Sequence, residues 1–444
     1  MMLTTSFLAL LACSNDSTKD LGPSGLQDTD TAQPPECGVA EDFQQDWHAL
    51  TEGIGRVPLD GSYPSRIVPF GERAFPVVVD SAGHTIIAAA RFGEGRLLHV
   101  GHEALIGGLL ASARGVRGLL RNTLAWMGPE EPRIGVEPGH PDLVSFLQGE
   151  GIASTEVSPA ELQEVDIYIR GSSGELSEEA SSQIVAHVEA GGGLISGGHA
   201  WYWGYTNENA AENHPGNQVL VPMGLLLTTA YSEADTHVLP DEPPAALSHP
   251  SAALQAIIHH VSGGSTLDEG ALQVATTAVR LAAAELPLSV GEYEECLRYY
   301  LAQANPVHPT PSNPLIPLEQ PIDSLTATID HKFMQELPAE ELLAHGAHTD
   351  FPGEIPDTAT PTTASLEINA SYAGRPAEYI YSNAGSPRWE STGLYIAAGE
   401  PVSVTAPAEA VDSGIDLLIG SHTDTLWHLE SIERLPAITR TWPI

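Results

Sequence analysis

The chain has 444 residues, and 42% of them are hydrophobic, which is enough for about two to four domains with packed cores. Its 58 acidic residues outnumber its 18 Lys and Arg, and the formal net charge of −40 argues against binding nucleic acid or an anionic membrane through a broad positive face. No apolar run is long enough to predict a membrane-spanning helix. Three cysteines are too few for a disulfide framework, and the sequence leaves open whether Cys37 and Cys296 pair.

The N-terminus predicts export. Residues 1–12 form a predicted signal segment, whose apolar stretch ends at Cys13. Leu10-Leu-Ala-Cys13 resembles a bacterial lipobox, and this resemblance implies that Cys13 carries lipid and that the chain is an exported lipoprotein of the bacterial outer membrane or cell surface. Residues 13–40 are rich in Ser, Asp, Thr, Pro and Gly and predict a disordered tether; an ordinary frayed terminus is the alternative.

Residues 41–130 predict an α/β unit. Phe75–Val79 and Thr85–Arg91 are apolar runs of strand length, separated by turn residues typical of a hairpin. Arg96–Val100 is a third predicted strand, and helical spacing of apolar residues follows between His102 and Met127.

Residues 131–232 alternate between predicted strands and helices. Ser177 precedes two Glu residues and predicts a helix N-terminus, and the glycines at 191–193 predict the end of that helix. This alternation is typical of a parallel sheet flanked by helices. The predicted strands are Ile134–Val136, Asp166–Arg170 and Leu194–Ser196, and the predicted helices are 141–148 and 180–190.

The stretch from Leu176 to His199 resembles the Rossmann-like, class I glutamine-amidotransferase-like fold. It is also similar to the N-terminal region of the TRP-channel-associated-factor proteins, and the segments 198–203 and 214–217 add to that resemblance. The amidotransferase fold would place its nucleophile elbow at Ser196-Gly-Gly-His199. That chemistry needs Cys, and this position offers Gly and His, so we expect an elbow kept for structure rather than an amidohydrolase.

The second half of the chain contains two regions with different predicted secondary structure. Residues 233–356 predict a helical region, interrupted between Asn305 and Pro321 by a proline-rich connector. Residues 357–444 predict a C-terminal β-sandwich after a Pro/Thr linker, which makes the overall fold class α/β plus all-β. The helices are predicted at 251–261, 266–286, 290–304 and 322–344, and the strands at 365–369, 393–396, 402–405 and 415–419.

Three motifs near the C-terminus follow one another: Ser391-Thr-Gly-Leu-Tyr395, Ile419-Gly-Ser-His-Thr-Asp-Thr-Leu-Trp427 and Pro436-Ala-Ile-Thr-Arg-Thr-Trp-Pro443. In this order they resemble the opening of the enhancin-like, mucin-directed zinc metallopeptidases (peptidase family M-60). That family binds zinc on an H-E-x-x-H helix, which this chain lacks: His102-Glu103-Ala-Leu-Ile106 has Ile where the second His is required. We therefore expect no catalytic residue, no metal ligand and no cofactor in this chain; zinc is expected only if a downstream peptidase region is present.

Trp201, Tyr202 and Trp203 form the candidate glycan-binding site, because exposed aromatic rings stack on sugar rings; packing of a loop against the sheet is the alternative. His422, Asp424 and His428 have no zinc-ligand spacing and predict structural polar packing.

Two functions follow from these patterns. The first is the non-catalytic N-terminal part of a secreted or surface-anchored zinc metallopeptidase directed at mucin or other glycoproteins. The alternative is a non-enzymatic surface lipoprotein that binds glycans or a protein partner. In either case the expected partners are mucin-type glycans or glycoproteins and, through the lipid anchor, a membrane, but no nucleic acid.

Overall fold

The structure is a computed structural model of the 444-residue chain. It describes residues 35–37, 43–59, 62–107, 114–207, 209–233, 236–239, 242–244, 246–290, 293–342, 344–350, 353–356, 358–369, 389–411, 413–420, 426–435 and 439–444. Cys13 and the predicted signal segment lie outside these residues, as do His422 and Asp424. The chain divides into two compact units, residues 32–304 and a second unit that contains residues 305–444, and each is described by itself.

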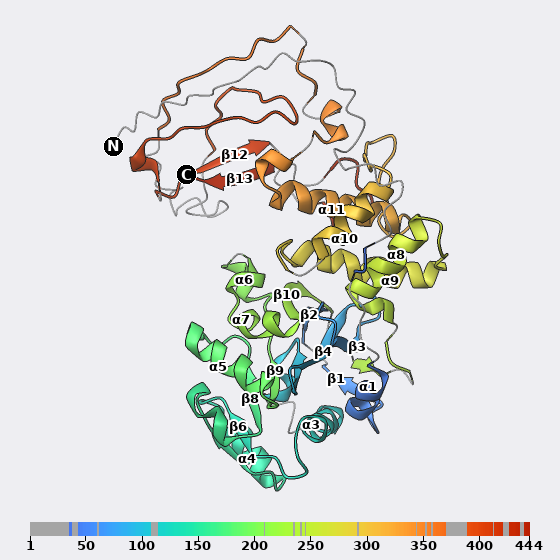
Figure 1. The fold of residues 1–444 in the computed structure, drawn as a ribbon, viewed down its shortest axis with the longest axis vertical. Coiled ribbons are helices and arrows are strands. Elements are labelled where there is room, and N and C mark those ends of the chain that lie inside the picture. The colour runs from blue at the N-terminus through green and yellow to red at the C-terminus, as the bar shows by residue number, and fades with distance from the viewer. Residues whose placement is uncertain are drawn as a thin grey trace. The chain divides into compact units, whose positions relative to one another are not determined.

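The first unit is built on a mixed seven-stranded sheet with the strand order β3-β4-β5-β9-β8-β6-β7 (Figure 1). The first three strands are antiparallel neighbours, and the remaining pairs from β5 to β7 are parallel. A parallel pair needs a crossover connection, which the helices between these strands supply. The strands are β3 (Ala74–Val79), β4 (Thr85–Phe92), β5 (Gly95–Val100), β6 (Ile134–Val136), β7 (Ser154–Glu156), β8 (Ile167–Gly171) and β9 (Gly193–Gly197).

Helices cover both faces of this sheet. Alternation along β8 sends Ile167 and Ile169 to one face and Tyr168 to the other. The first face packs with α1 (Gln44–Thr51), α3 (Arg114–Met127) and α4 (Pro141–Gly149). The second face packs with η2 (Pro159–Glu164), α5 (Glu178–Glu189) and α7 (Asn217–Leu220). The result is a three-layer α/β arrangement, which confirms the mixed α/β class.

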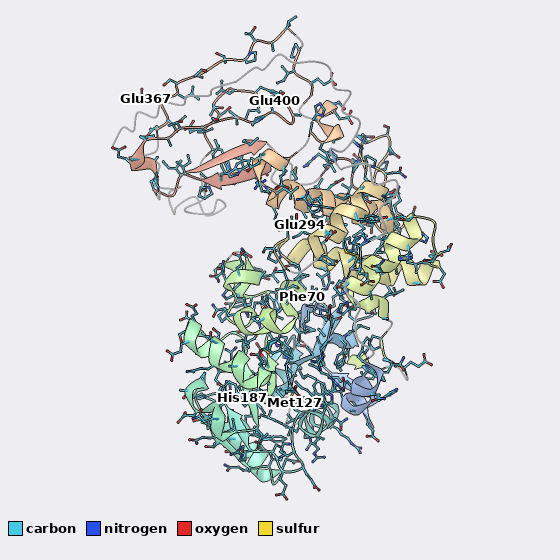
Figure 2. The ribbon with its side chains drawn as sticks, in the orientation of Figure 1. Phe70, Met127, His187, Glu294, Glu367 and Glu400 are labelled. Atoms are coloured by element: carbon cyan, nitrogen blue, oxygen red, sulfur yellow. A yellow bond between two sulfur atoms is a disulfide. The ribbon has the colours of Figure 1, made fainter. Side chains whose placement is uncertain are left out.

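The glycines at 191–193 have two separate roles. Gly191 has a φ of +110° just after α5, a conformation that ends the helix and that only glycine adopts easily. A Cβ on Gly192 would lie 2.2 Å from the His187 ring, and one on Gly193 would lie 3.1 Å from the Met127 Cβ. His187 and Met127, both labelled in Figure 2, therefore pack directly against the start of β9.

Two small antiparallel pairs join distant parts of the first unit. β2 (Ser65–Pro69) pairs with β10 (Leu225–Tyr231), and β1 (Arg56–Pro58) pairs with β11 (Thr236–Val238). In the first pair Tyr231 lies opposite Ser65, which brings residues more than 160 positions apart to the same place. None of these four strands was predicted from the sequence.

The helices α8 (Pro250–Val261), α9 (Glu269–Glu285) and α10 (Tyr293–Gln303) complete the first unit. Cys37 and Cys296 form a disulfide with a Cα–Cα distance of 5.7 Å, which answers the question that the sequence left open. The backbone N–H of Cys37 also donates to Gln255 Oε1 of α8 at 3.0 Å. The segment 35–37 is thus fixed to two of these helices.

The second unit contains α11 (Pro321–Glu336) and an antiparallel pair, β12 (Asp416–Gly420) with β13 (Thr439–Pro443). Leu315, Ala327 and Ile432 form a small buried cluster, and the partly buried Trp427 packs against it. Gln335 Nε2 donates to the Thr439 carbonyl at 2.6 Å and so connects α11 to β13.

The predicted β-sandwich is not confirmed. Within residues 358–444, β12 and β13 are the only strands in the described part, and the predicted strands at 365–369, 393–396 and 402–405 have no ladder partner there. Alternation of apolar residues predicts an extended chain, but it does not supply a partner strand. Among the described residues, no helix is long and apolar enough to cross a membrane.

Candidate binding site at the carboxyl ends of the parallel strands

The carboxyl ends of β5 and β9 bring together the residues of the candidate site. These strands are parallel neighbours with Val100 opposite Gly197, so His102 and His199 occupy equivalent positions two residues beyond the strand ends. In open α/β sheets this edge is where ligands bind.

Trp201 and the four tyrosines around it form a cluster that we call the aromatic face: Tyr63, Trp201, Tyr202, Tyr205 and Tyr231. The ring centroids of the four tyrosines lie between 5.8 and 6.5 Å from that of Trp201. Three of these contacts are edge-to-face, the arrangement that the aromatic quadrupole favours. Tyr202 is 68% exposed and Tyr205 is 71% exposed, and Tyr63 and Tyr231 are about half exposed.

Hydrogen bonds to the backbone hold this face in place. The buried Ser65 Oγ accepts from the backbone N–H groups of Ala200 at 2.9 Å and Trp201 at 3.3 Å. The Trp201 indole Nε1 donates to the Tyr63 carbonyl at 2.7 Å. The backbone around Trp201 is therefore fixed by β2, and the exposed rings project from a rigid base.

A charged group adjoins the aromatic face. The His199 ring stacks on Trp201 with centroids 5.0 Å apart, and His199 Nδ1 lies 2.9 Å from Glu103 Oε1. Burial alone would raise the pKa of Glu103, but the hydrogen bond with His199 lowers it below its usual range, so Glu103 is a carboxylate at neutral pH. The His102 ring also stacks on His199 with centroids 6.1 Å apart, and burial lowers the pKa of His102.

The three predicted glycan-binding residues lie in different surroundings. Trp201 and Tyr202 belong to the aromatic face. Trp203 instead makes an edge-to-face contact with the buried His214 at 5.3 Å. The sequence missed Tyr63 and Tyr231, because only the β2–β10 pairing brings them to Trp201. The glycan role of Trp201, Tyr202 and Trp203 stays a prediction.

The predicted elbow after β9 begins with a turn at Gly198 and lies near Ser172. Gly198 has a φ of +149°, and a Cβ there would lie 2.1 Å from Ser172 Oγ. His214 Nδ1 accepts from the backbone N–H of Gly216 at 3.1 Å, so the neutral ring carries its proton on Nε2. The structural role of this elbow stays a prediction.

His102-Glu103-Ala-Leu-Ile106 forms no zinc-binding helix. His102 is extended, and only the short 3-10 helix η1 (Glu103–Leu105) follows it. In the described part of the chain, no group of three or more His, Cys, Asp or Glu side chains could hold a metal ion.

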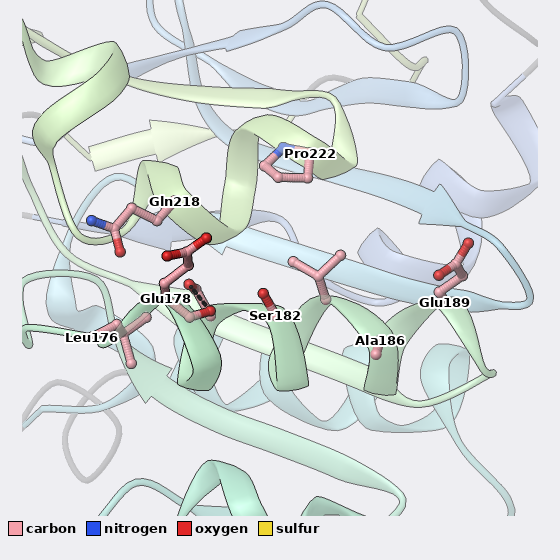
Figure 3. A pocket seen from close by; sticks show the side chains of 9 residues that line it. Leu176, Glu178, Ser182, Ala186, Glu189, Gln218 and Pro222 are labelled. Atoms are coloured by element: carbon pink, nitrogen blue, oxygen red, sulfur yellow. Dashed lines mark hydrogen bonds between the residues drawn. The ribbon is translucent and has the colours of Figure 1, made fainter.

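A separate, open groove runs along α5 (Figure 3). Leu176, Val185 and Pro222 give it apolar walls, and Glu178 and Glu189 add carboxylates. No residue of the aromatic face lines this groove, and it holds none of the buried unpaired polar atoms found near β9.

Comparison with known proteins gives two family matches. Residues 27–242, just under half of the chain, match the model described as "TRPM8, N-terminal domain". Residues 358–444 match the N-terminal domain of M60-like peptidases, in agreement with the C-terminal motifs.

The similar curated proteins are channel-associated factors. The chain is 26% identical to a TRPM8 channel-associated factor homolog of Danio rerio, over 91% of this chain and 43% of that protein. It is 28% identical to TRPM8 channel-associated factor 3 of Rattus norvegicus, over 90% of this chain and 41% of that protein. The chain thus spans less than half the length of these relatives.

Among solved structures, the IMPa metallopeptidase in complex with T-antigen is similar at 12% identity with a TM-score of 0.41, covering 64% of this chain and 36% of that one. A similarity of this size supports no conclusion about function.

These matches correct three predictions. The predicted N-terminal part of a secreted, mucin-directed metallopeptidase is wrong, because the relatives that cover 90% of the chain or more are TRPM8 channel-associated factors. The bacterial lipoprotein and its outer-membrane or cell-surface location are wrong for the same reason, and the lipid anchor at Cys13 has no support. The C-terminal motifs led to the wrong function because they indicate an M60-like N-terminal segment, which this chain combines with a resemblance to channel-associated factors along most of its length.

Proposed function

We propose that this chain is a non-enzymatic binding module that associates with a protein partner, as the names of its relatives state for those proteins, and that the aromatic face is its contact surface. The observation that carries the proposal is the aromatic face itself: two tyrosines more than two-thirds exposed, on a backbone fixed by Ser65 and Tyr63. Tyr and Trp are enriched among the residues that contribute most to protein interfaces, and rigid aromatic anchors lose little conformational entropy on binding.

The first partner to test is a TRPM8-type channel, because the relatives are named for association with it. The purified chain, immobilised through one end, should retain detergent-solubilised TRPM8. The double variant Tyr202→Ala/Tyr205→Ala should retain at least about tenfold less, since hot-spot side chains contribute about 2 kcal/mol or more each.

Tyr395→Ala is the matched control, because Tyr395 is 52% exposed but lies in the other unit. Equal retention by the double variant and the wild type would show that the aromatic face is not the contact surface. No retention by the wild type would reject the channel as partner.

The sugar-binding role of Trp201, Tyr202 and Trp203 is a second proposal, supported by the exposure of Tyr202. Binding to mucin-type glycans that is lost in Tyr202→Ala, without any channel retention, would favour it over a protein partner.

We also propose the finer fold assignment, an amidotransferase-like arrangement of the sheet; the parallel strands β5, β9, β8, β6 and β7 with crossover helices support it.

The predicted domain boundaries near residues 40, 130, 232 and 356 are proposals as well. β5 and β9 come from either side of residue 130 and share one sheet, so 41–130 and 131–232 would have to fold together.

A further inference from the structure

The outward surface of the aromatic face is the starting point, and the inference rests on the function proposed above. His199 stacks on Trp201, the four tyrosine rings lie around it, and Tyr202 and Tyr205 are the most exposed of these rings. The rings that a partner meets first are therefore Tyr202 and Tyr205, whose centroids lie 6.0 Å apart in an edge-to-face contact. The face of each ring carries the negative part of the aromatic quadrupole, which attracts a cation placed over it.

Glu103 supplies a negative charge at the same edge of the sheet as the aromatic face. The Glu103 side chain is 36% exposed, and it is connected to Trp201 through the stacked His199 ring. Its carboxylate state at neutral pH follows from its hydrogen bond with His199. The rings and the carboxylate thus both favour a positively charged group.

Arg66, a cation close to the aromatic face, is already engaged by other residues of this chain. Arg66 lies on β2 near Tyr231, its Nε donates to Ser232 Oγ at 3.4 Å, and the charge of Asp80 acts on it. Burial lowers the pKa of Arg66, and Asp80 opposes this effect. Since Arg66 is partly buried and has a counter-charge, it leaves the Tyr202 and Tyr205 rings free to meet a cation from outside.

The net charge of the whole chain adds a long-range electrostatic attraction for cationic partners. A net charge of −40 raises the local concentration of cationic segments and speeds their approach. Long-range attraction does not select one surface, so selection must come from the local rings and Glu103.

We propose that the aromatic face binds an arginine- or lysine-containing segment of a protein partner, with a cation of that segment stacked on Tyr202 and Tyr205 and with Glu103 as a negative charge at the same edge of the sheet. Arginine suits this site best, because its planar guanidinium stacks on an aromatic ring.

A pair of peptides tests the charge directly. One is a short arginine-containing peptide, and the other carries citrulline, which is neutral and nearly the same shape, at each arginine. Measured by calorimetry with the full chain at physiological ionic strength, the arginine peptide should bind about two- to fivefold more tightly, as expected for one exposed cation–π contact. Tyr202→Ala/Tyr205→Ala should remove this preference although it leaves the net charge unchanged.

Glu103→Gln separates the effect of the carboxylate from that of the rings and should weaken arginine binding by up to about fivefold while leaving citrulline binding unchanged. Glu189→Gln, in the groove along α5, is the charge-matched control and should bind like the wild type. Equal affinity for the two peptides, or a tyrosine double variant that keeps the preference for arginine, would overturn the proposal.

The same peptides distinguish this inference from the proposed function. If TRPM8 retention depends on Tyr202 and Tyr205 but neither peptide is preferred, the aromatic face is a protein-binding surface without selection for cations. If the arginine preference depends on the tyrosines but no channel is retained, the cation site stands and the channel is the wrong partner.

Discussion

Three buried polar side chains cross the middle of the sheet in one row. His99 on β5 and Arg170 on β8 both lie opposite Ser196 on β9, so the three side chains share one face of neighbouring strands. All three are at most 2% exposed. Arg170 Nε lies 3.6 Å from Glu137 Oε1, which compensates its charge, whereas neither ring nitrogen of His99 has a hydrogen-bond partner in the described part of the chain. Ser196 is followed along the chain by the two glycines that lead to His199 and Trp201.

Burial of His99 and His214 makes the stability of the folded protein depend on pH. It lowers the pKa of His99 to about 3 and that of His214 to about 4, against an ordinary value of 6.5. The folded protein therefore keeps both rings neutral, whereas the unfolded chain binds protons below pH 6.5. The stabilisation is fully present above pH 6.5 and is lost progressively as the pH falls from 6.5 to about 4 for His214 and to about 3 for His99, at roughly 1.4 kcal/mol per pH unit for each histidine. Urea unfolding at pH 7.5, 6 and 5 should show this loss.

His214→Asn identifies the source of that loss, because the Asn side-chain oxygen can still accept from Gly216 N–H but does not titrate. Its free energy of unfolding should fall less between pH 7.5 and 5 than that of the wild type. His259→Asn, at an exposed position of α8, is the control and should follow the wild type. Parallel pH profiles for all three proteins would contradict the assignment.

At the scale of elements, α5 depends on its N-terminal cap. Ser177 Oγ accepts from the backbone N–H of Ala180 at 3.2 Å and satisfies a donor that the helix itself cannot. Ser177→Ala should lower the free energy of unfolding by about 1 kcal/mol. Ser182→Ala, an exposed change within the same helix, should have no effect or a slightly stabilising one because Ala favours helix. Chemical denaturation measures both, and equal values would show that the cap contributes nothing.

The elements that the sequence predicted are those specified by local pattern. β3, β4 and β5 follow from apolar runs with a turn between β3 and β4, and α5 follows from Ser177 and the glycines after it. β2 and β10 were missed because each gains its stability from a partner far along the chain, and α1 was missed because its anchors also lie in other elements, 45 and 80 residues away. Asp46 of α1 accepts from Arg91 of β4 at 2.7 Å and from Trp126 Nε1 of α3 at 2.8 Å.

The residues of the candidate site also divide into those that local sequence predicted and those that it missed. Trp201 and Tyr202 stand out in the sequence as part of an aromatic run. Tyr63 and Tyr231 do not, because their place beside Trp201 depends on the register that sets Tyr231 opposite Ser65. A single sequence specifies such a register only weakly, since a one-residue shift would send every side chain of a strand to its other face.

At the scale of the whole molecule, the Cys37–Cys296 disulfide encloses nearly all of the first unit, with a sequence separation of 259 residues. A cross-link over so long a loop removes much of the conformational freedom of the unfolded chain. The double variant Cys37→Ser/Cys296→Ser should therefore lose about 2–5 kcal/mol of stability in urea unfolding. Reductant should destabilise the wild type to the same level and leave the variant unchanged; a variant as stable as the oxidised wild type would mean that the disulfide constrains little.

The same disulfide also determines how the chain carries mechanical load. Cys37 lies just inside the start of the first unit, residues 32–304, and Cys296 lies just before its end. A pull on the segment before Cys37, resisted by the unit that follows residue 304, passes through one covalent bond instead of through the hydrogen bonds of the sheet. About 900 Å of extensible chain stays out of the line of force while the sulfurs are joined. Tension between the two ends of this unit thus leaves the sheet and its aromatic face unloaded, and only chemical reduction would transfer the force to them.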